Sequence, residues 1–283
     1  MKTRISAVVL TLNEEHNLPK ALRSVSSWVD EIVVVDMHSD DKTPDIARSF
    51  NAKLFVHPRV GLQDPAREFA MGKATGEWII NLDADEIIPY ALSRRLLEIA
   101  ETDAADVCTI PRLNYFSGAP MLHSGWGADD DRQVRFFRKG YLQFSPDIHT
   151  RPRPIDNARV LPLAFQSGLY IVHFNYLDSH HFLEKFDRYT SIEAEQAYAR
   201  GNGSTVRGFI VPPLREFIVR YIVKRGFRDG WRGFYYSAIM SAYRMTIAAK
   251  LRELETDCQG SRCSQQYSRI AEEYLKEYGR QSD

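Results

Sequence analysis

The stretch Asn81-Leu82-Asp83-Ala84-Asp85-Glu86 closes an apolar run, residues 77–82, that has the length and composition of a buried strand. Side chains two residues apart on a strand share a face, so we expect Asp83 and Asp85 to point the same way, with Cα atoms roughly 6.5 to 7 Å apart. Two carboxylates this close raise each other's pKa unless a positive charge lies beside them. A divalent cation, Mg²⁺ or Mn²⁺, supplies that charge and also binds substrate phosphates. The motif therefore predicts a metal and diphosphate site, and the alternative is a solvated acidic turn that caps the next helix.

Apolar segments alternate with helical patterns along the first part of the chain. Strands are expected at residues 5–12, 31–36, 53–57 and 77–82, and helices at 18–28, 43–50, 64–74 and 89–100. Strands separated by helices of this length form parallel β-α-β units, because a parallel pair needs a crossover connection. The sequence therefore predicts an α/β fold with a mostly parallel, Rossmann-like sheet flanked by helices. A further strand is expected at residues 106–111, followed by a loop at 114–127 that forms an acceptor wall.

Polar residues follow several of these strands at their carboxyl ends. They are Asn13, Glu14, Asp36, Asp83 and Asp85. Ligands of a doubly wound sheet bind beyond the carboxyl ends of the strands, so we expect these side chains in one crevice. The first strand-to-helix turn has no G-x-G-x-x-G, and the chain has no G-x-x-x-x-G-K-[ST]. We therefore expect phosphate to be bound through a metal ion and not through a glycine-rich loop.

The composition narrows the classes of function. The 283 residues include 37 basic and 37 acidic side chains, so the formal net charge is zero and we expect no nucleic-acid partner. Cys108, Cys258 and Cys263 form no paired framework and lack the spacing of a zinc site, which indicates a reducing compartment. The alternative for Cys258 and Cys263 is that they are neighbours in a loop. No stretch reaches the roughly 18 to 20 apolar residues of a membrane-spanning helix. These features predict a cytoplasmic protein.

Three segments together resemble a known enzyme family. They are Val8-Val9-Leu10-Thr11-Leu12-Asn13-Glu14-Glu15, Val33-Val34-Val35-Asp36 and Trp78-Ile79-Ile80-Asn81-Leu82-Asp83-Ala84-Asp85-Glu86. In this order and at this spacing they resemble the nucleotide-sugar half of the family 2 glycosyltransferases, which have the GT-A fold. The resemblance covers residues 1–102. It departs from the family pattern at Met37-His38-Ser39, where the family often has Ser-Gly-Ser or Gly-Ser-Thr.

The resemblance implies roles for individual residues on the donor side. The implied donor-binding residues are Thr11, Asn13, Glu14, Asp36, Arg67, Asp83 and Ala84. The first three would line the nucleoside pocket, and Asp36 would accept a hydrogen bond from the base. Arg67 would lie near the diphosphate, and Asp83 would contact the ribose or the sugar. Asp85 would ligate the Mg²⁺ or Mn²⁺ ion.

Acidic residues that follow Trp126 are candidates for a catalytic base. An inverting transfer needs a carboxylate to take the proton of the acceptor hydroxyl, a contribution of roughly 10² to 10⁴ in rate. This part of the chain resembles the Trp-x-Pro-Asp and Arg-Leu-Phe segment of bacterial enzymes that extend the lipopolysaccharide core. Counting back from Arg135 selects Asp131, counting forward from Trp126 selects Asp129, and Asp130 lies between them. We take Asp131 as the base; the alternative is a solvated loop without a catalytic role.

The resemblance and the flanking residues also give expectations for four histidines. The resemblance places a histidine near the donor phosphates at about the position of His149. The apolar flanks of His173, His180 and His181 favour packing between a strand and a helix, so we do not expect these three to be metal ligands.

The last part of the chain differs in character from the rest. Residues 212–225 and 231–251 intersperse aromatic and aliphatic side chains with Arg and Lys, which is typical of helices that lie on anionic membranes without spanning them. The alternative is that the same residues pack on the catalytic domain or on a second subunit. We expect a catalytic domain over residues 1–200, with its acceptor half at 103–200, and a helical tail over 201–283.

The patterns and the resemblance together predict an inverting, metal-dependent hexosyltransferase. Its donor would be a nucleotide sugar, uridine-linked, and its acceptor a lipid-linked or cell-envelope glycan such as lipopolysaccharide core. It would work on the cytoplasmic face of the membrane, with peripheral contact through the C-terminal helices. Two alternatives remain open: a sugar nucleotidyltransferase, and a relative that binds a nucleotide sugar or a membrane without turnover.

Overall fold

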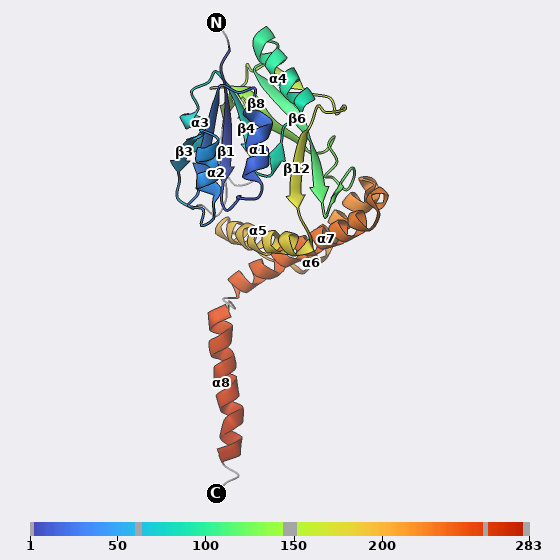
Figure 1. The fold of residues 1–283 in the computed structure, drawn as a ribbon. Coiled ribbons are helices and arrows are strands. Elements are labelled where there is room, and N and C mark those ends of the chain that lie inside the picture. The colour runs from blue at the N-terminus through green and yellow to red at the C-terminus, as the bar shows by residue number, and fades with distance from the viewer. Residues whose placement is uncertain (1–2, 60–63, 144–151, 257–259, 280–283) are drawn as a thin grey trace. The chain divides into compact units, whose positions relative to one another are not determined.

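A computed structural model describes residues 3–59, 64–143, 152–256 and 260–279 (Figure 1). The chain forms two compact units, Met1–Leu177 and Asp178–Asp283. The second unit begins before residue 201 because helix α5 (Ser179–Ala199) packs on α7 (Gly230–Glu255), where the rings of Phe182 and Tyr236 lie 5.2 Å apart.

The first unit is an α/β domain. Its helices are α1 (Leu18–Val25), α2 (Thr43–Ser49), α3 (Asp64–Lys73) and α4 (Tyr90–Thr102). Its strands are β1 (Ile5–Thr11), β2 (Glu31–Asp36), β3 (Lys53–Val56), β4 (Trp78–Asp83), β5 (Glu86–Ile87), β6 (Val107–Phe116), β7 (Ala119–Pro120), β8 (Arg132–Arg138), β9 (Leu142–Gln143), β10 (Arg153–Pro154), β11 (Val160–Pro162) and β12 (Ile171–Tyr176). The predicted alternation of strands and helices over the first hundred residues is confirmed, with ends shifted by one to three residues in most elements.

The main sheet has the strand order β3-β2-β1-β4-β8-β6-β12-β5. The pairs β3–β2, β2–β1, β1–β4 and β6–β12 are parallel, whereas β8 runs antiparallel between β4 and β6. This is the predicted mostly parallel sheet, and β8 joins its two parallel parts.

Helices cover both faces of the first half of the sheet. Ala7 and Val9 of β1 pack with residues of α1, α2 and α4, whereas Val8 and Leu10 pack with residues of α3. Because successive side chains point to opposite faces and both faces are covered, β1 is buried at every position. This is the physical reason that the strand is an uninterrupted apolar run in the sequence.

Two local expectations were wrong. The chain turns at Ala84 and Asp85 between β4 and β5, so the face-sharing rule of an extended strand does not apply to Asp83 and Asp85. The turn forms because β5 pairs antiparallel with β12, with Glu86 opposite His173. Strand β6 also continues to Phe116, since β12 pairs with it in parallel, and Asn114 therefore lies in the sheet and not in a loop.

The second unit is helical. Its further elements are α6 (Val206–Phe217), a π-helix η1 (Ile218–Val223), a 3₁₀ helix η2 (Gly226–Asp229) and α8 (Gly260–Gly279). Lys250 of α7 donates from Nζ to Asp187 Oδ1 at 2.6 Å and to Thr190 Oγ1 at 2.9 Å, which fastens α7 to α5. Ser241 of α7 donates to the carbonyl oxygen of Pro213 in α6 at 2.8 Å. Within the described ranges, the structure has no helix with the length and apolar character needed to cross a membrane.

The cysteines differ from one another in state. Cys108 in β6 is a buried free thiol, and burial raises its pKa to about 12. Cys263 is disulfide-bonded, so the expectation of unpaired cysteines was wrong for this residue. Cys258 lies outside the described residues.

Candidate active site

The carboxyl ends of β1, β2 and β4 lie side by side at one edge of the sheet. Thr11 is opposite Asp36 in the β1–β2 register, and Leu10 is opposite Asp83 in the β1–β4 register. Thr11 Oγ1 donates to Asp36 Oδ1 at 3.1 Å, and both residues are buried. Parallel pairing therefore brings together three of the residues expected to bind the donor, Thr11, Asp36 and Asp83.

The turn after Asp36 keeps a hydrogen-bonded form although the family's glycine is absent. His38 takes its place with a φ of 58°, in the left-handed region that glycine adopts most easily and histidine tolerates. Ser39 donates to the Asp36 carboxylate from its backbone N at 2.9 Å and from Oγ at 2.5 Å. The sequence departure thus changes a residue of the turn and leaves Asp36 held.

The loops after β1 and β2 position Asn13 and Glu14. Asn13 also has a positive φ, 56°, and its backbone N donates to Ser39 Oγ at 2.8 Å. Its Oδ1 accepts a hydrogen bond from the backbone N of Asp40 at 2.8 Å, and Glu14 N donates to Thr43 Oγ1 at 2.8 Å. Asn13 is exposed and Glu14 is half-buried, so both remain on the accessible side of this edge.

Asp83 lies between two arginines. Arg67 of α3 donates to its Oδ1 at 2.8 Å, and Arg135 of β8 pairs with its Oδ2. Burial of the carboxyl opposes ionisation, but Arg135, Arg67 and Arg112 outweigh that effect and hold the pKa of Asp83 well below its usual range. The positive charge beside the motif thus comes from arginine in this structure.

Glu86 extends this network across the sheet. Its side chain is fully buried, and its Oε1 accepts from Arg135 at 2.8 Å and from Arg112 at 3.1 Å. Its Oε2 accepts from the backbone N of Asp83 at 2.9 Å. Arg112 of β6 also donates from Nε to Asp131 Oδ2 at 2.8 Å. The two guanidinium groups therefore connect Asp83, Glu86 and Asp131 in one buried cluster.

The three consecutive aspartates after Trp126 have different environments. Asp129 and Asp130 are exposed, whereas Asp131 is 6 % exposed. The Asp131 carboxylate accepts from Asn114 Nδ2 at 2.8 Å and from Gln133 Nε2 at 2.5 Å, in addition to Arg112. Burial opposes ionisation, but these three donors lower the pKa of Asp131 below its usual value. Asp131 is therefore an oriented, ionised carboxylate.

Asn114 connects Asp131 to His173 by hydrogen bonds. Its Nδ2 donates to Asp131 and to the carbonyl oxygen of Trp126 at 2.9 Å, so its Oδ1 is the acceptor that faces His173 Nδ1 at 2.7 Å. His173 Nδ1 therefore carries a proton. Nε2 of the same ring lies 3.4 Å from Asp85 Oδ2.

Asp85 and His173 fit one divalent cation. Two ligands at adjacent corners of an octahedral Mg²⁺ site with bonds of about 2.1 Å lie roughly 3 Å apart, which is close to the observed separation of Oδ2 and Nε2. A metal-binding histidine usually donates its other ring N–H to an oxygen, as His173 does to Asn114. Among the described residues no group of three metal-ligating side chains occurs, so donor phosphates and water would complete the coordination.

Ala84 and His149 were also expected near the donor. Ala84 is 4 % exposed and packs into the core, so it can offer a donor its backbone only. His149 lies outside the described residues.

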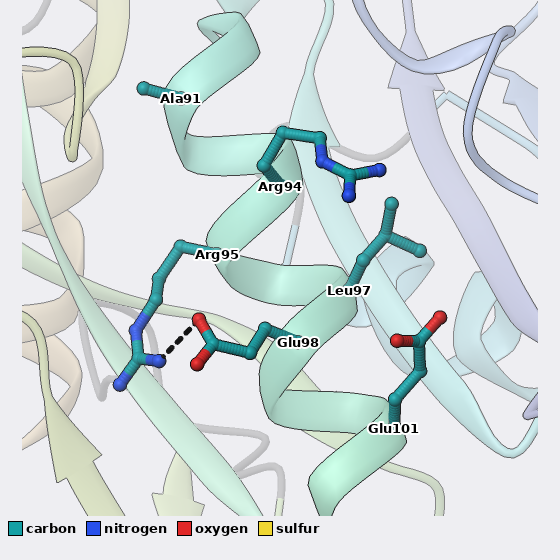
Figure 2. A pocket seen from close by; sticks show the side chains of 6 residues that line it. All are labelled: Ala91, Arg94, Arg95, Leu97, Glu98 and Glu101. Carbon is teal, nitrogen blue, oxygen red and sulfur yellow. Dashed lines mark hydrogen bonds and ion pairs between the residues drawn. The ribbon is translucent and has the colours of Figure 1, made fainter.

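A separate hollow on α4 is lined by Ala91, Arg94, Arg95, Leu97, Glu98 and Glu101 (Figure 2). Arg95 and Glu98 form an ion pair of 2.7 Å there, and no residue of the candidate site lines this hollow.

Sequence reasoning missed Glu86, Arg112, Asn114 and Arg135 as functional candidates, and it expected only a packing role for His173. Arg135 lies in the alternating strand β8, and Asn114 lies where a loop was expected. The available signal was charge inside strands, since a charged side chain on a buried strand is rarely tolerated without a partner.

Known proteins give an independent comparison. The family model described as Glycosyl transferase family 2 matches residues 6–154. The lipopolysaccharide core biosynthesis glycosyltransferase LpsC of Rhizobium meliloti (strain 1021) is 27% identical over 261 residues, which are 88% of this chain and 92% of LpsC.

Two solved structures are also similar. S. aureus TarS 1–349 in complex with UDP aligns with a TM-score of 0.47 and 14% identity, over 91% of this chain and 92% of that chain. Glucosyl-3-phosphoglycerate synthase from Mycobacterium tuberculosis aligns with a TM-score of 0.33 and 22% identity, over 40% of this chain and 44% of that chain.

The family match spans more than half of the 283 residues. It includes every residue of the candidate site described above except His173. The mostly parallel sheet with its flanking helices is the GT-A type of fold that the motifs predicted. The chain belongs to glycosyl transferase family 2.

Proposed function

We propose that this chain transfers a hexose from a uridine-linked nucleotide sugar to a lipid-linked or cell-envelope glycan, with inversion at the anomeric carbon. The observation that carries the proposal is the cluster that Arg112 and Arg135 connect: Asp83 at the end of β4, Glu86 at the start of β5 and Asp131 just before β8. Asp85 and His173 lie 3.4 Å apart beside it. The role of the relative LpsC in lipopolysaccharide core biosynthesis supports the acceptor class.

The donor would lie along the carboxyl edge of β1, β2 and β4. Thr11, Asn13 and Glu14 would line the nucleoside pocket, and Asp36 would accept from the base. Arg67 supports a diphosphate role because it is a guanidinium next to Asp83, and guanidinium groups match phosphate geometry. The diphosphate would take over the hydrogen bond that Arg67 now donates to Asp83.

A divalent cation, Mg²⁺ or Mn²⁺, would be held by Asp85 Oδ2 and His173 Nε2. When bound, it offsets negative charge on the leaving diphosphate. Asn114 would keep His173 in the tautomer with a free Nε2 lone pair, which is the form that binds metal. The donor set of one carboxylate oxygen and one imidazole nitrogen suits either ion, and Mn²⁺ accepts the nitrogen more readily.

Asp131 would act as the general base. The acceptor hydroxyl oxygen attacks the anomeric carbon on the face opposite the diphosphate, its proton passes to the Asp131 carboxylate, and the carbon–oxygen bond to the diphosphate breaks. Arg112, Asn114 and Gln133 orient the carboxylate for this step, and holding the reacting groups in place lowers the barrier further. The hydrogen bonds make Asp131 a weaker base, so positioning is the larger part of its effect.

Two other functions compete with this proposal. A sugar nucleotidyltransferase would carry a glycine- and basic-rich segment after the first strand, and residues 11–16 have none. A non-catalytic relative would bind a nucleotide sugar without turnover, so product formation separates it from an enzyme.

Calorimetric titration of nucleotides and nucleotide sugars, with Mn²⁺ and then with chelator, tests the proposal. We expect one uridine-linked sugar to bind in the presence of Mn²⁺ and to lose most of its affinity after chelation. The anomeric configuration of the product, measured by NMR, then tests inversion. A folded sample that binds none of the panel would contradict the proposal.

A further inference from the structure

The segment from α6 to the start of α7 carries an exposed apolar row. Val206, Ile210, Leu214, Ile218 and Ile222 recur at every fourth residue, and their side chains are between 43% and 79% exposed. Residues four apart lie on neighbouring positions of a helix surface, so these five side chains form a continuous row along α6 and η1. After the break at Arg225, Phe227, Trp231 and Phe234 add further apolar surface, and each is more than half exposed. An exposed apolar surface of this size marks an interaction site.

The same segment concentrates positive charge. Residues 205–234 contain seven basic side chains and two acidic ones, an excess of five positive charges in a chain whose net charge is zero. Of the two acidic residues, Glu216 already accepts from Arg220 at 2.6 Å and from Arg244 at 3.2 Å. Arg207, Arg215, Arg225 and Arg228 are exposed. The apolar row is therefore flanked by cations.

The packing of the second unit leaves this row outside its core. Helix α6 faces α7 through Pro213, which is buried and accepts a hydrogen bond from Ser241. The core positions of α7, Tyr236 and Tyr243, pack instead on Phe182 and Phe186 of α5. A second copy of the same surface would bring two cationic segments together, which opposes association through this face.

We propose that the apolar row and its flanking arginines bind the surface of a bilayer that contains anionic phospholipid. The apolar side chains would enter the boundary between headgroups and acyl chains, and the arginines would remain at the phosphates. This inference deepens the proposed function, because a lipid-linked acceptor is presented at such a surface. It does not depend on catalysis, since the surface contains no residue of the candidate active site.

Co-sedimentation of the full-length chain with vesicles tests the inference. We expect binding to vesicles of phosphatidylcholine and phosphatidylglycerol, little binding to phosphatidylcholine alone, and weaker binding as salt rises. Neutralising three cations near the surface should weaken partitioning about 100-fold. The charge variant combines Arg207→Gln, Arg225→Gln and Arg228→Gln. The apolar variant combines Leu214→Ser, Ile218→Ser and Ile222→Ser.

Matched controls show whether the losses come from this surface or from substituting any exposed residues of the same kind. The charge control combines three exposed cations of the first unit, Lys20→Gln, Arg23→Gln and Arg94→Gln. The apolar control combines three exposed residues of α8, Tyr267→Ser, Tyr274→Ser and Leu275→Ser. Both controls should bind vesicles as the parent does, and circular dichroism should report an unchanged fold in every variant.

Three outcomes would overturn the inference. They are equal binding to neutral and anionic vesicles, equal losses in the variants and their controls, and concentration-dependent oligomers with no vesicle binding, which would assign the row to a second copy. Metal-dependent donor binding is measured on the same samples, and the variants and controls should bind the donor as the parent does. A parent chain that binds vesicles but no donor would contradict the proposed transfer and leave the membrane inference standing.

Discussion

Asp83 and Asp85 are separated by one residue and yet have different partners. Arg67 and Arg135 neutralise Asp83, whereas Asp85 lies against the imidazole of His173. A carboxylate between two guanidinium groups has little charge left to offer a cation, whereas a carboxylate beside an imidazole can share a cation with it. We therefore propose that Asp85 holds the metal and that Asp83 contacts the donor.

This assignment predicts the effect of removing each metal ligand. Asp85→Ala and His173→Ala should each weaken Mn²⁺-supported donor binding at least tenfold, because the cation loses one of two protein ligands. Titration calorimetry with and without Mn²⁺ measures the difference. Asp129→Ala, at an exposed site, should behave as the parent. If Asp85→Ala binds donor like the parent in both conditions, the metal assignment is wrong.

Asp131 should be needed for transfer and not for donor binding. Asp131→Asn keeps the shape of the side chain but cannot take a proton, so kcat should fall by roughly 10² to 10⁴. Donor affinity should stay unchanged, because the side chains that hold the Asp131 carboxylate, Arg112, Asn114 and Gln133, are not among the residues expected to bind the nucleoside. A quenched-flow or coupled assay measures kcat, and Asp129→Asn is its control. Full activity of Asp131→Asn would exclude Asp131 as the base.

The hydrogen bonds on Asp131 also predict a pH profile. Because its pKa lies below the usual value, Asp131 is ionised throughout the neutral and mildly acidic range, and kcat/KM should not fall through its protonation near pH 5. Gln133→Leu removes one donor to the ionised form, so the pKa should rise and the acidic limb should move to higher pH. An unchanged or lower limb in Gln133→Leu would contradict the role of this hydrogen bond.

At the scale of elements, Glu31 fastens the amino ends of several strands. It begins β2 and accepts from Ser6 of β1, from Lys53 of β3 at 2.6 Å, and from the backbone N of Thr75 before β4 at 2.8 Å. Burial opposes its ionisation, but these donors lower the pKa of Glu31 to about 2. This network lies at the sheet edge opposite the candidate site and keeps the strands in register.

Glu31→Gln should therefore destabilise the fold in a pH-dependent way. The folded pKa of about 2 lies below the unfolded value of 4.5, so the ionised form contributes about 3 kcal/mol to the free energy of unfolding above pH 4.5. That contribution decreases as pH falls from 4.5 toward 2. Urea unfolding at pH 7, 4.5 and 3 measures it, with the exposed Glu98→Gln as control. A difference that is the same at every pH would contradict this account.

At the scale of the whole molecule, each unit has its own core. The first unit buries Trp78 and Phe136, whose rings stack at 4.6 Å, and the second buries Tyr236 against Phe182. The expected donor residues all belong to the first unit. The segment proposed to bind membranes belongs to the second.

Tyr236→Ala tests whether donor binding by the first unit is independent of the fold of the second unit. Removing a fully buried aromatic ring should cost about 3 to 5 kcal/mol in the second unit and increase proteolysis of α5 to α7. Metal-dependent donor binding should remain, because its residues lie in the first unit. Limited proteolysis and calorimetry on the same sample measure both effects. Loss of donor binding together with the second unit would show that the site depends on both.

Much of the first unit was determined by the sequence itself. The buried runs that form β1, β2 and β4 have a local pattern that is independent of distant contacts, and their order predicts the parallel sheet. Because parallel strands end at a common edge, the placement of Thr11, Asp36 and Asp83 followed from the strands alone.

Only the tertiary structure decided the partners of these residues. The pairing of β5 with β12 turns the chain at Asp85 and brings His173 beside it across more than 80 residues, which no local pattern encodes. The sequence already favoured Asp131 over Asp129 and Asp130, but its burial against Arg112 and Asn114 from another strand is a property of the folded chain alone. Long-range ion pairs and hydrogen bonds are set by strand order and register, so the chemistry of each carboxylate emerged only when the sheet was assembled.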